Sequence, residues 1–171
     1  MFAPKFHPAM RFVQPIRKSL DFRTAFNILG PLANPAKVKA QVMGVSDIDL
    51  LPRIAEALKM LGTKRAMVVH GQGMDEISLL GKTKVLELRD GVVTSLELDP
   101  SDYGIDHASI DELGSGDAIA NACVIRDILA GNIHGPRRDI VVLNAAAAIV
   151  VADLAEDLQQ AISLAEYSID G

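Results

Sequence analysis

The sequence predicts an α/β fold with a mixed central sheet flanked by helices and preceded by a short helical segment. Two observations predict the sheet. Apolar strand patterns alternate with amphipathic helical patterns from Val38 onward, which is typical of βαβ units. A hairpin pattern follows and adds antiparallel strands. A third observation concerns the residues before Val38, where short helical patterns are interrupted by Pro and Gly.

The first residues are expected to form two helices. Pro8 suits the first position of a helix that bends at Pro15, because proline lacks a backbone N–H and has a fixed φ. A second helix is expected at about residues 24–29. Gly30 and Pro31 then form a stop signal, since glycine caps a helix end and proline does not continue it.

The next part of the chain predicts a βαβ unit. A strand is expected at residues 40–45, an amphipathic helix at residues 50–61 closed by Gly62, and a second strand at residues 66–69. The second strand is nearly continuously apolar, which favours a central position buried on both faces. The two strands should be parallel with a right-handed crossover.

A hairpin should follow the βαβ unit. Residues 85–88 and 92–98 read as strands separated by Arg-Asp-Gly, a signature of a tight turn. Residues 100–113 read as irregular.

Three helices are expected after that. The first is a helical run that ends at Gly131, the second a buried helix at residues 140–155, and the third a helix that begins near Asp157, a good cap. Asn144 and Asp153 interrupt the second helix, which is shorter than the ~20 residues that span a bilayer. Its four consecutive alanines indicate close helix packing.

Composition limits the function. The chain has 171 residues, a net charge of −5 and a pI near 5.3, so there is no basic excess for non-specific binding of nucleic acid. The only cysteine, Cys123, cannot form an intramolecular disulfide and is expected to be a small buried hydrophobe. Because Pro4 and Lys5 follow Met1 closely, we expect no signal peptide and a cytoplasmic location.

The stretch RAMVVHGQGMDEIS, residues 65–78, carries the strongest candidate for a site. Its strand ends at His70, and Gly71 and Gly73 allow a turn before the adjacent carboxylates Asp75 and Glu76. The carboxyl end of a strand is where open α/β sheets usually bind ligands. Two adjacent acids suit a hard cation such as Mg²⁺. The alternative is an acidic surface turn.

Other candidates are weaker by pattern alone. GSGD at residues 114–117 resembles a phosphate cradle, but Asp117 would repel phosphate and suits a helix cap. Arg17 can form a bidentate contact with a carboxylate, although its spacing from the neighbouring arginines favours a solvated face. His7 lies before a proline and is either a pocket residue or an exposed one.

Several long strings, taken together, resemble the anthranilate phosphoribosyltransferase family. They are FAPKFHPAMRFVQPIRKSLDFRTAFNILGPLANPA, VVHGQGMDEIS, NACVIRDILAG and GPRRDIVVLNAAAA, and they cover nearly the whole chain in the family's order. The resemblance implies the fold shared with pyrimidine nucleoside phosphorylases. It also implies transfer of a phosphoribosyl group from phosphoribosyl pyrophosphate to anthranilate, with release of pyrophosphate, in tryptophan biosynthesis.

The resemblance also implies roles for individual residues. Asp75 and Glu76 match the acidic pair that holds Mg²⁺ bound to pyrophosphate, and Arg17 matches the arginine that meets the anthranilate carboxylate. His7 and Pro31 match residues lining the anthranilate route. No covalent catalytic residue is implied. The partners expected are the two small-molecule substrates and a second copy in the full-length protein, with neither nucleic acid nor a membrane.

One departure from the family pattern is large. The family's glycine-rich GTGGD loop, which cradles pyrophosphate, is not in the sequence. We therefore expect a C-terminal fragment or truncated homologue that is inactive alone, with residues 1–37 from a small helical domain and residues 38–171 from the α/β domain. The alternatives are a related paralogue with the nucleoside phosphorylase fold and a non-catalytic binding module.

Overall fold

The computed structural model describes residue 12 and residues 26–34, 36–114 and 116–171. The chain forms two compact units, Met1–Val38 and Lys39–Gly171, and each is described here by itself. Most of the helix expected to bend at Pro15 lies outside the described residues.

The first unit contains helix α3, Phe26–Leu32. The stop signal predicted at Gly30 and Pro31 is wrong, because α3 continues through both residues. Pro31 lies near the end of this seven-residue helix, so its missing N–H removes one backbone hydrogen bond without a following helix to disrupt. The helix end is closed by a bond from the Ala33 N–H to the Leu29 carbonyl oxygen, at 2.8 Å.

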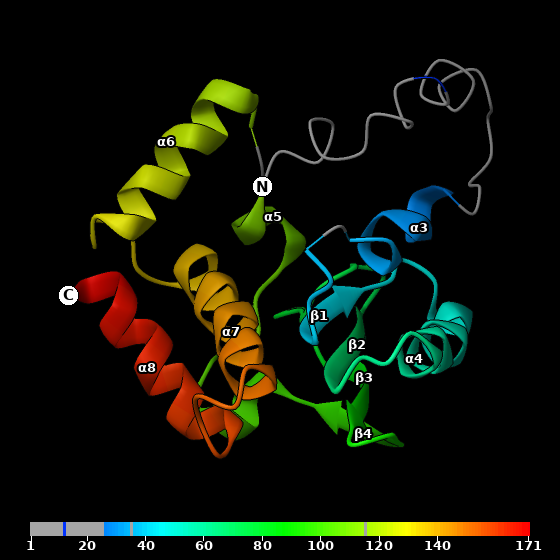
Figure 1. Ribbon diagram of the computed structural model, residues 1–171. Coiled ribbons are helices and arrows are strands. Elements are labelled where there is room, and N and C mark those ends of the chain that lie inside the picture. The colour runs from blue at the N-terminus through cyan, green and yellow to red at the C-terminus, as the bar shows by residue number, and fades with distance from the viewer. Residues whose placement is uncertain (1–11, 13–25, 35, 115) are drawn as a thin grey trace. The chain divides into compact units, whose positions relative to one another are not determined.

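The second unit is built on a sheet of four strands in the order β1-β2-β3-β4. The strands are β1, Ala40–Gly44; β2, Arg65–Gly71; β3, Thr83–Arg89; and β4, Val92–Leu98. The β1 and β2 strands are parallel, whereas β2 with β3 and β3 with β4 are antiparallel. The predicted mixed sheet is therefore confirmed, with β2 inside it (Figure 1).

The connections of this sheet follow the predicted turns. Between β1 and β2 lie the short helix η1, Ile48–Leu50, and helix α4, Leu51–Met60, after which Gly62 adopts a φ of +74°. The β3–β4 hairpin turns through Asp90 and Gly91, with φ values of 50° and 81°. Positive φ at both central positions is what a two-residue type I′ turn requires.

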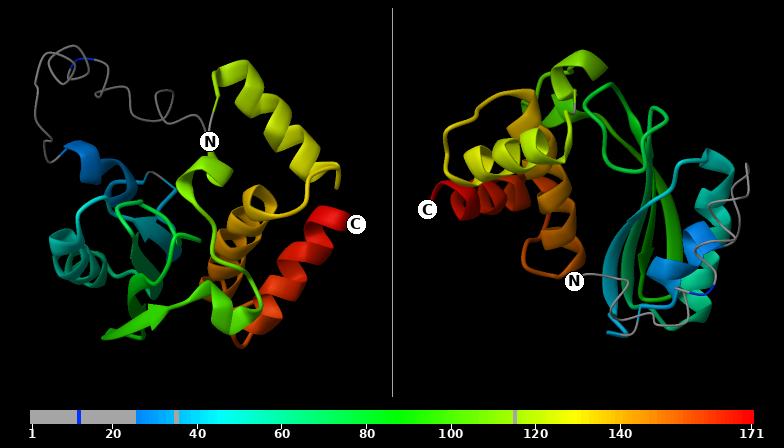
Figure 2. Two further views of the ribbon diagram at one scale, coloured as in Figure 1. Left: turned by 180° about the vertical axis from the view of Figure 1, so that it is seen from behind. Right: turned by 90° about the horizontal axis from the view of Figure 1, so that it is seen from above.

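Helices cover both faces of the sheet (Figure 2). Helix α4 packs on one face, where Ala66 and Val68 of β2 are fully buried. On the other face, Met67 and Val69 join a core cluster with α7, Pro136–Val151, and α8, Leu158–Asp170. Because side chains alternate along a strand, β2 contributes to the core on both faces, as its apolar run predicts.

The alanine run of α7 fits the predicted close packing. Ala146 and Ala147 are fully buried and belong to the core cluster that α7 and α8 share. Helix α8 begins after Asp157, whose carboxylate accepts a bond of 2.8 Å from the Gln160 N–H, as expected of a cap.

The segment expected to be irregular contains two short helices, η2, Pro100–Tyr103, and α5, Ile110–Leu113. Each was too short to give a helical period in the sequence. Helix α6, Ala118–Leu129, follows, and Asp117 caps it by accepting bonds from the Ile119 and Ala120 N–H groups. The cap interpretation of GSGD therefore agrees with the structure.

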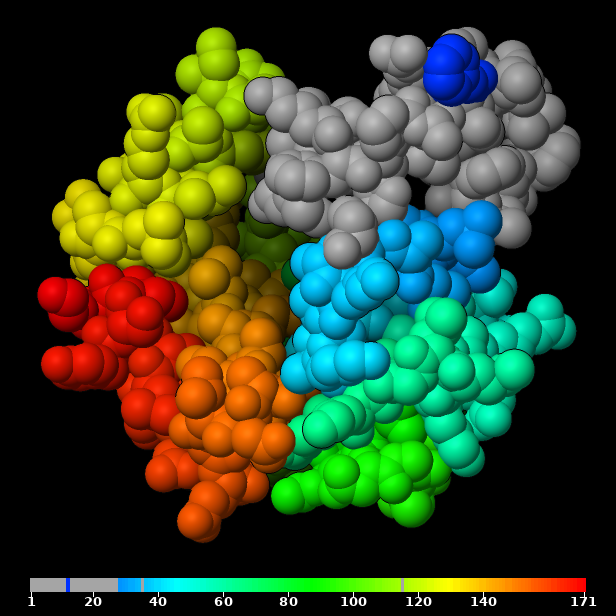
Figure 3. All heavy atoms as spheres, viewed as in Figure 1, coloured from blue at the N-terminus to red at the C-terminus, as the bar shows by residue number. Residues whose placement is uncertain are grey.

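Cys123 is exposed, so the predicted burial of this residue is wrong. Helix α6 lies beside α8 and its atoms are the yellow-green and yellow spheres at the surface in Figure 3. It buries only Ile128, while Ile119, Ile125 and Leu129 are 77%, 57% and 61% exposed. The apolar residues of α6 are spread around the helix, so the packing of α8 on one side leaves several of them exposed.

In the part of the chain that the structure describes, none of the helices combines the length and apolarity needed to cross a membrane.

Candidate functional site

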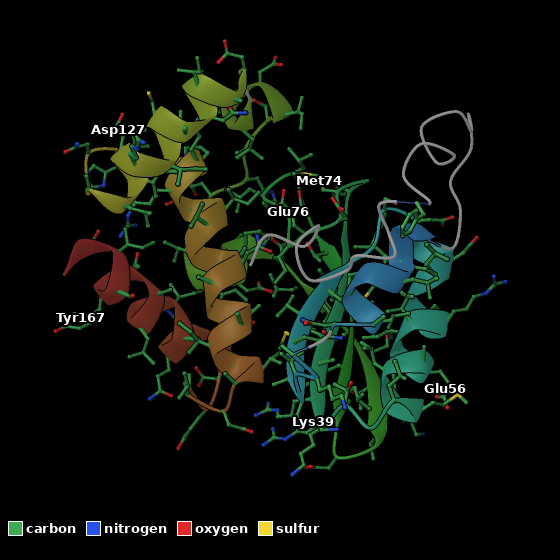
Figure 4. The ribbon with its side chains drawn as sticks, turned by 45° about the horizontal axis from the view of Figure 1, so that its top comes forward. Lys39, Glu56, Met74, Glu76, Asp127 and Tyr167 are labelled. Atoms are coloured by element: carbon green, nitrogen blue, oxygen red, sulfur yellow. The ribbon has the colours of Figure 1, made fainter. Side chains whose placement is uncertain are left out.

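The acidic pair lies on a loop, residues 72–78, which is the first part of the connection between β2 and β3. Because β1 and β2 are parallel, their carboxyl ends meet at the same edge of the sheet, and this loop begins there. Figure 4 shows Met74 and Glu76 at the opposite end of the sheet from Lys39, which precedes β1. The loop therefore occupies the edge at which α/β sheets usually bind ligands.

The loop begins with a tight turn. The Gly71 N–H bonds to the Met74 carbonyl oxygen at 3.0 Å, and the Met74 N–H bonds to the Gly71 carbonyl oxygen at 2.8 Å. Gln72 and Gly73 between them have φ values of 52° and 85°. The turn directs the chain back toward the sheet immediately before Asp75.

Two glycines allow the acidic residues to lie against the sheet. A Cβ at Gly44, the last residue of β1, would overlap the Asp75 carbonyl oxygen. A Cβ at Gly71 would lie 2.6 Å from the Glu76 carbonyl oxygen and 2.6 Å from Ser78 Cβ. Side chains at either position would push the backbone of the acidic pair away. The loop therefore folds over the ends of both parallel strands.

Polar contacts hold the residues around the loop. His70 Nδ1 lies 2.7 Å from the Val45 carbonyl oxygen, which joins the ends of β1 and β2. At the far end of the loop, the Ser78 N–H donates to Thr83 Oγ1 at 3.0 Å. Ser78 and Thr83 are both fully buried, so this contact satisfies polar groups that water does not reach.

Asn144, on α7, holds the loop through hydrogen bonds to Ile77. Its Oδ1 accepts a bond of 2.9 Å from the Ile77 N–H, and its Nδ2 donates to the Ile77 carbonyl oxygen at 2.8 Å. Nδ2 also donates to the Ile140 carbonyl oxygen at 2.9 Å. In the sequence, Asn144 is visible only as a polar interruption of an apolar helix. The signal was present, because a polar residue in such a helix requires hydrogen-bond partners.

The two carboxylates differ in environment. Asp75 is exposed and Glu76 is half-buried. Burial, and then the adjacent negative charge of Asp75, raise the pKa of the Glu76 carboxyl above its ordinary value. Among the residues that the structure describes, neither carboxylate forms an ion pair. A cation bound between them would relieve both the repulsion and the cost of burial.

The donor set fits Mg²⁺ shared with a phosphate ligand. Within residues 26–34, 36–114 and 116–171, no three His, Cys, Asp or Glu side chains gather as a complete metal site. Two carboxylates are nevertheless what Mg²⁺ uses when waters and substrate phosphates supply the remaining ligands. The geometry favours a metal site that is completed by an anionic substrate.

Of the five residues predicted for the site, the described part of the chain brings together Asp75 and Glu76. Pro31 lies in α3, in the first unit. Arg17 and His7 lie outside the described residues. Their roles stay predictions. Three further residues hold the loop in the structure without having been predicted from the sequence, namely Gly44, Asn144 and Thr83.

A parallel-stranded edge with an acidic pair on a loop held by close backbone contacts is a candidate site for a metal ion shared with an anionic ligand. Residues 1–171 match the family model described as "Glycosyl transferase family, a/b domain", and the chain belongs to this family. A relative, "Anthranilate phosphoribosyltransferase" from Thermoanaerobacter sp. (strain X514), is 52% identical over 171 residues, which are 99% of this chain and 50% of the relative. The chain thus spans about half the length of the curated relatives it matches.

Solved structures of anthranilate phosphoribosyltransferases are also similar to this chain. The anthranilate phosphoribosyltransferase from Thermus thermophilus superposes with a TM-score of 0.87 at 40% identity, covering 95% of this chain and 48% of that chain. The enzyme from Saccharomyces cerevisiae in complex with PRPP and Mg gives a TM-score of 0.85 at 30% identity, covering 95% and 47%. The predicted resemblance and the predicted α/β fold are both confirmed.

Proposed function

We propose that the protein to which these residues belong transfers a phosphoribosyl group from phosphoribosyl pyrophosphate to anthranilate, with release of pyrophosphate. The observation that carries the proposal is the acidic pair Asp75 and Glu76, on a loop held by hydrogen bonds and close backbone contacts. The pair lies within a chain that matches anthranilate phosphoribosyltransferases over 99% of its length. The step belongs to tryptophan biosynthesis.

The chemistry needs what this loop offers. Displacement of pyrophosphate places positive charge on the ribose and negative charge on the leaving diphosphate. Mg²⁺, when bound, neutralises the developing charge on the diphosphate. Asp75 and Glu76 would hold the ion, and the close contacts of their backbone with Gly44 and Gly71 fix the position of the pair before the reaction. Such preorganisation is usually the largest catalytic contribution.

The remaining roles in the proposal come from the family resemblance. Arg17 binds the anthranilate carboxylate through a charge-assisted bidentate contact, and His7 and Pro31 line the route of anthranilate. Residues 1–37 belong to a small helical domain, and residues 38–171 belong to the α/β domain. The full-length protein is a cytoplasmic homodimer that uses Mg²⁺ and binds neither nucleic acid nor membrane.

The test uses a joined protein, in which residues 1–171 follow the N-terminal half of the Thermoanaerobacter relative. Asp75→Asn with Glu76→Gln removes both metal-binding charges while keeping side-chain size. We expect the rate to fall strongly and the Mg²⁺ requirement to shift upward, because the diphosphate alone must then hold the ion. Loss of anthranilate fluorescence, followed against Mg²⁺ concentration, measures both effects.

The matched control is Glu56→Gln with Asp127→Asn, which removes the same number of negative charges at exposed positions. Figure 4 shows Glu56 on α4 and Asp127 on α6, both away from the labelled Glu76. This control should leave the Mg²⁺ curve unchanged. Superimposable curves for the acidic-pair variant and the parent would mean that the pair is only an acidic surface turn.

A further inference from the structure

Asn144 makes contacts that reach the acidic pair through the backbone. Its amide group pairs with both the N–H and the carbonyl oxygen of Ile77, at 2.9 and 2.8 Å, across 67 residues of sequence. Ile77 directly follows Glu76 and is fully buried. The two bonds therefore fix a core residue whose neighbour carries the metal-binding charge.

The geometry of the peptide bond extends this constraint to Glu76. The Ile77 N–H and the Glu76 carbonyl belong to one planar peptide unit. Asn144 holds the N–H side of that plane. On the carbonyl side, the Glu76 oxygen packs against Gly71, where a Cβ would lie only 2.6 Å away. With both sides of the plane fixed, the Cα–Cβ direction of Glu76 has little freedom.

Asn144 is itself held in place. The third hydrogen bond of the Asn144 side chain runs from Nδ2 to the Ile140 carbonyl oxygen, at 2.9 Å and one turn earlier in α7. Leu143 beside it is fully buried. Both Nδ2 protons and the Oδ1 oxygen of Asn144 are thus hydrogen-bonded. This pattern fixes the orientation of the amide. A rigid helix therefore presents a single, oriented amide to the loop.

We propose that Asn144 is a positioning residue for the Asp75–Glu76 pair. Through the position of this pair, Asn144 sets the affinity for the metal–diphosphate without contacting the metal or the diphosphate. This inference rests on the metal role given to the pair in the proposed function. Replacing residues that orient metal ligands without binding the metal typically changes metal affinity or activity by roughly 10–100-fold. We expect an effect of this size from loss of the Asn144 amide.

The variant is Asn144→Leu, which removes the amide without adding a charge. Its matched control is Asn121→Leu on α6. Asn121 makes the same kind of paired contact with one backbone residue, accepting from the Gly116 N–H at 2.8 Å and donating to the Gly116 carbonyl oxygen at 3.0 Å. Asn144→Gln keeps an amide but extends it by one methylene, and it serves if the leucine variant does not fold.

The first readout is binding of Mn²⁺ to the joined protein in the presence of inorganic pyrophosphate, followed by electron paramagnetic resonance. For Asn144→Leu we expect half-saturation at a roughly 10–100-fold higher Mn²⁺ concentration, with a smaller shift in the same direction for Asn144→Gln. Asn121→Leu should not shift it. A purely structural role would lower the melting temperature of both leucine variants without this difference in metal affinity.

The second readout separates the inference from the proposed function. If the parent binds Mn²⁺ with pyrophosphate but does not consume anthranilate, the proposed transferase activity is wrong and the positioning role is still decided by the binding curves. Equal half-saturation in the parent, Asn144→Leu and Asn144→Gln would overturn the inference. A parent that binds no Mn²⁺ with pyrophosphate would overturn it as well, together with the metal role of the pair.

Discussion

At Glu76, burial opposes the negative charge of the carboxylate. Its carboxyl is half-buried next to Asp75, and both factors raise its pKa. The folded protein therefore holds the Glu76 proton more tightly than the unfolded chain does. Stability should fall as pH rises from the ordinary pKa of a glutamate through the raised one, because the folded state must then accommodate the charge.

Glu76→Gln should remove this loss. In urea denaturation of the 171-residue chain without metal, we expect the variant to gain stability relative to the parent as pH rises above the ordinary pKa of a glutamate, with little difference at more acidic pH. Glu56→Gln, at an exposed position, is the control and should show no such gain. A gain that is equal at all pH values would contradict a raised pKa as its cause.

Single residues of the site differ in how far the sequence revealed them. Asp75 and Glu76 are candidates from the sequence alone because adjacent acids after a strand suit a hard cation. Gly44 was not found, since its requirement comes from the Asp75 backbone 31 positions later in the chain, against which a Cβ would collide. Such a contact leaves no local pattern. Asn144 lies between these cases, because its need for partners was visible and its partner was not.

At the scale of elements, α7 joins the core to the site. One side of the helix contributes Leu143 and Ala146 to the core, both fully buried. The same helix presents Asn144 to the loop. Close packing of α7 against its neighbours therefore determines where the Asn144 amide lies relative to Ile77.

Ala146→Leu should disturb this packing. A larger side chain at a fully buried alanine forces shifts that typically cost about 1–3 kcal/mol in unfolding free energy. Ala148→Leu, on the exposed side of the same helix, is the matched control and should change stability by within about 0.5 kcal/mol. Denaturant midpoints of the 171-residue chain measure both, and equal midpoints would contradict close packing as the reason for the alanine run.

Elements were predicted well where a period or turn extends over several residues. The parallel pair β1 and β2, the helix between them and the β3–β4 hairpin agree with the sequence patterns. Short helices such as η2 and α5 have too few residues to show a period. The Gly30–Pro31 signal failed for another reason, since a proline near the end of α3 costs too little to end the helix before it.

At the scale of the whole molecule, the 171 residues span about half of the relatives they match. The acidic pair is present, but Mg²⁺ keeps its waters and needs the substrate diphosphate to complete its ligands. In the family that the sequence resembles, a GTGGD loop cradles that diphosphate, and this sequence has none. Under the proposed function, the groups that stabilise the transition state would therefore be divided between this chain and the half of the relatives that it does not match.

We accordingly expect the purified 171-residue chain to consume no anthranilate in the presence of phosphoribosyl pyrophosphate and Mg²⁺, whereas the joined protein does. The physical reason is that an acidic pair without the diphosphate cradle cannot hold the leaving group in a fixed position, and fixed positioning supplies most of the electrostatic stabilisation. Anthranilate fluorescence measures both proteins under the same conditions. Turnover by the chain alone that scales with its concentration, and is lost in Asp75→Asn with Glu76→Gln, would contradict this division. It would place the complete catalytic machinery within these 171 residues.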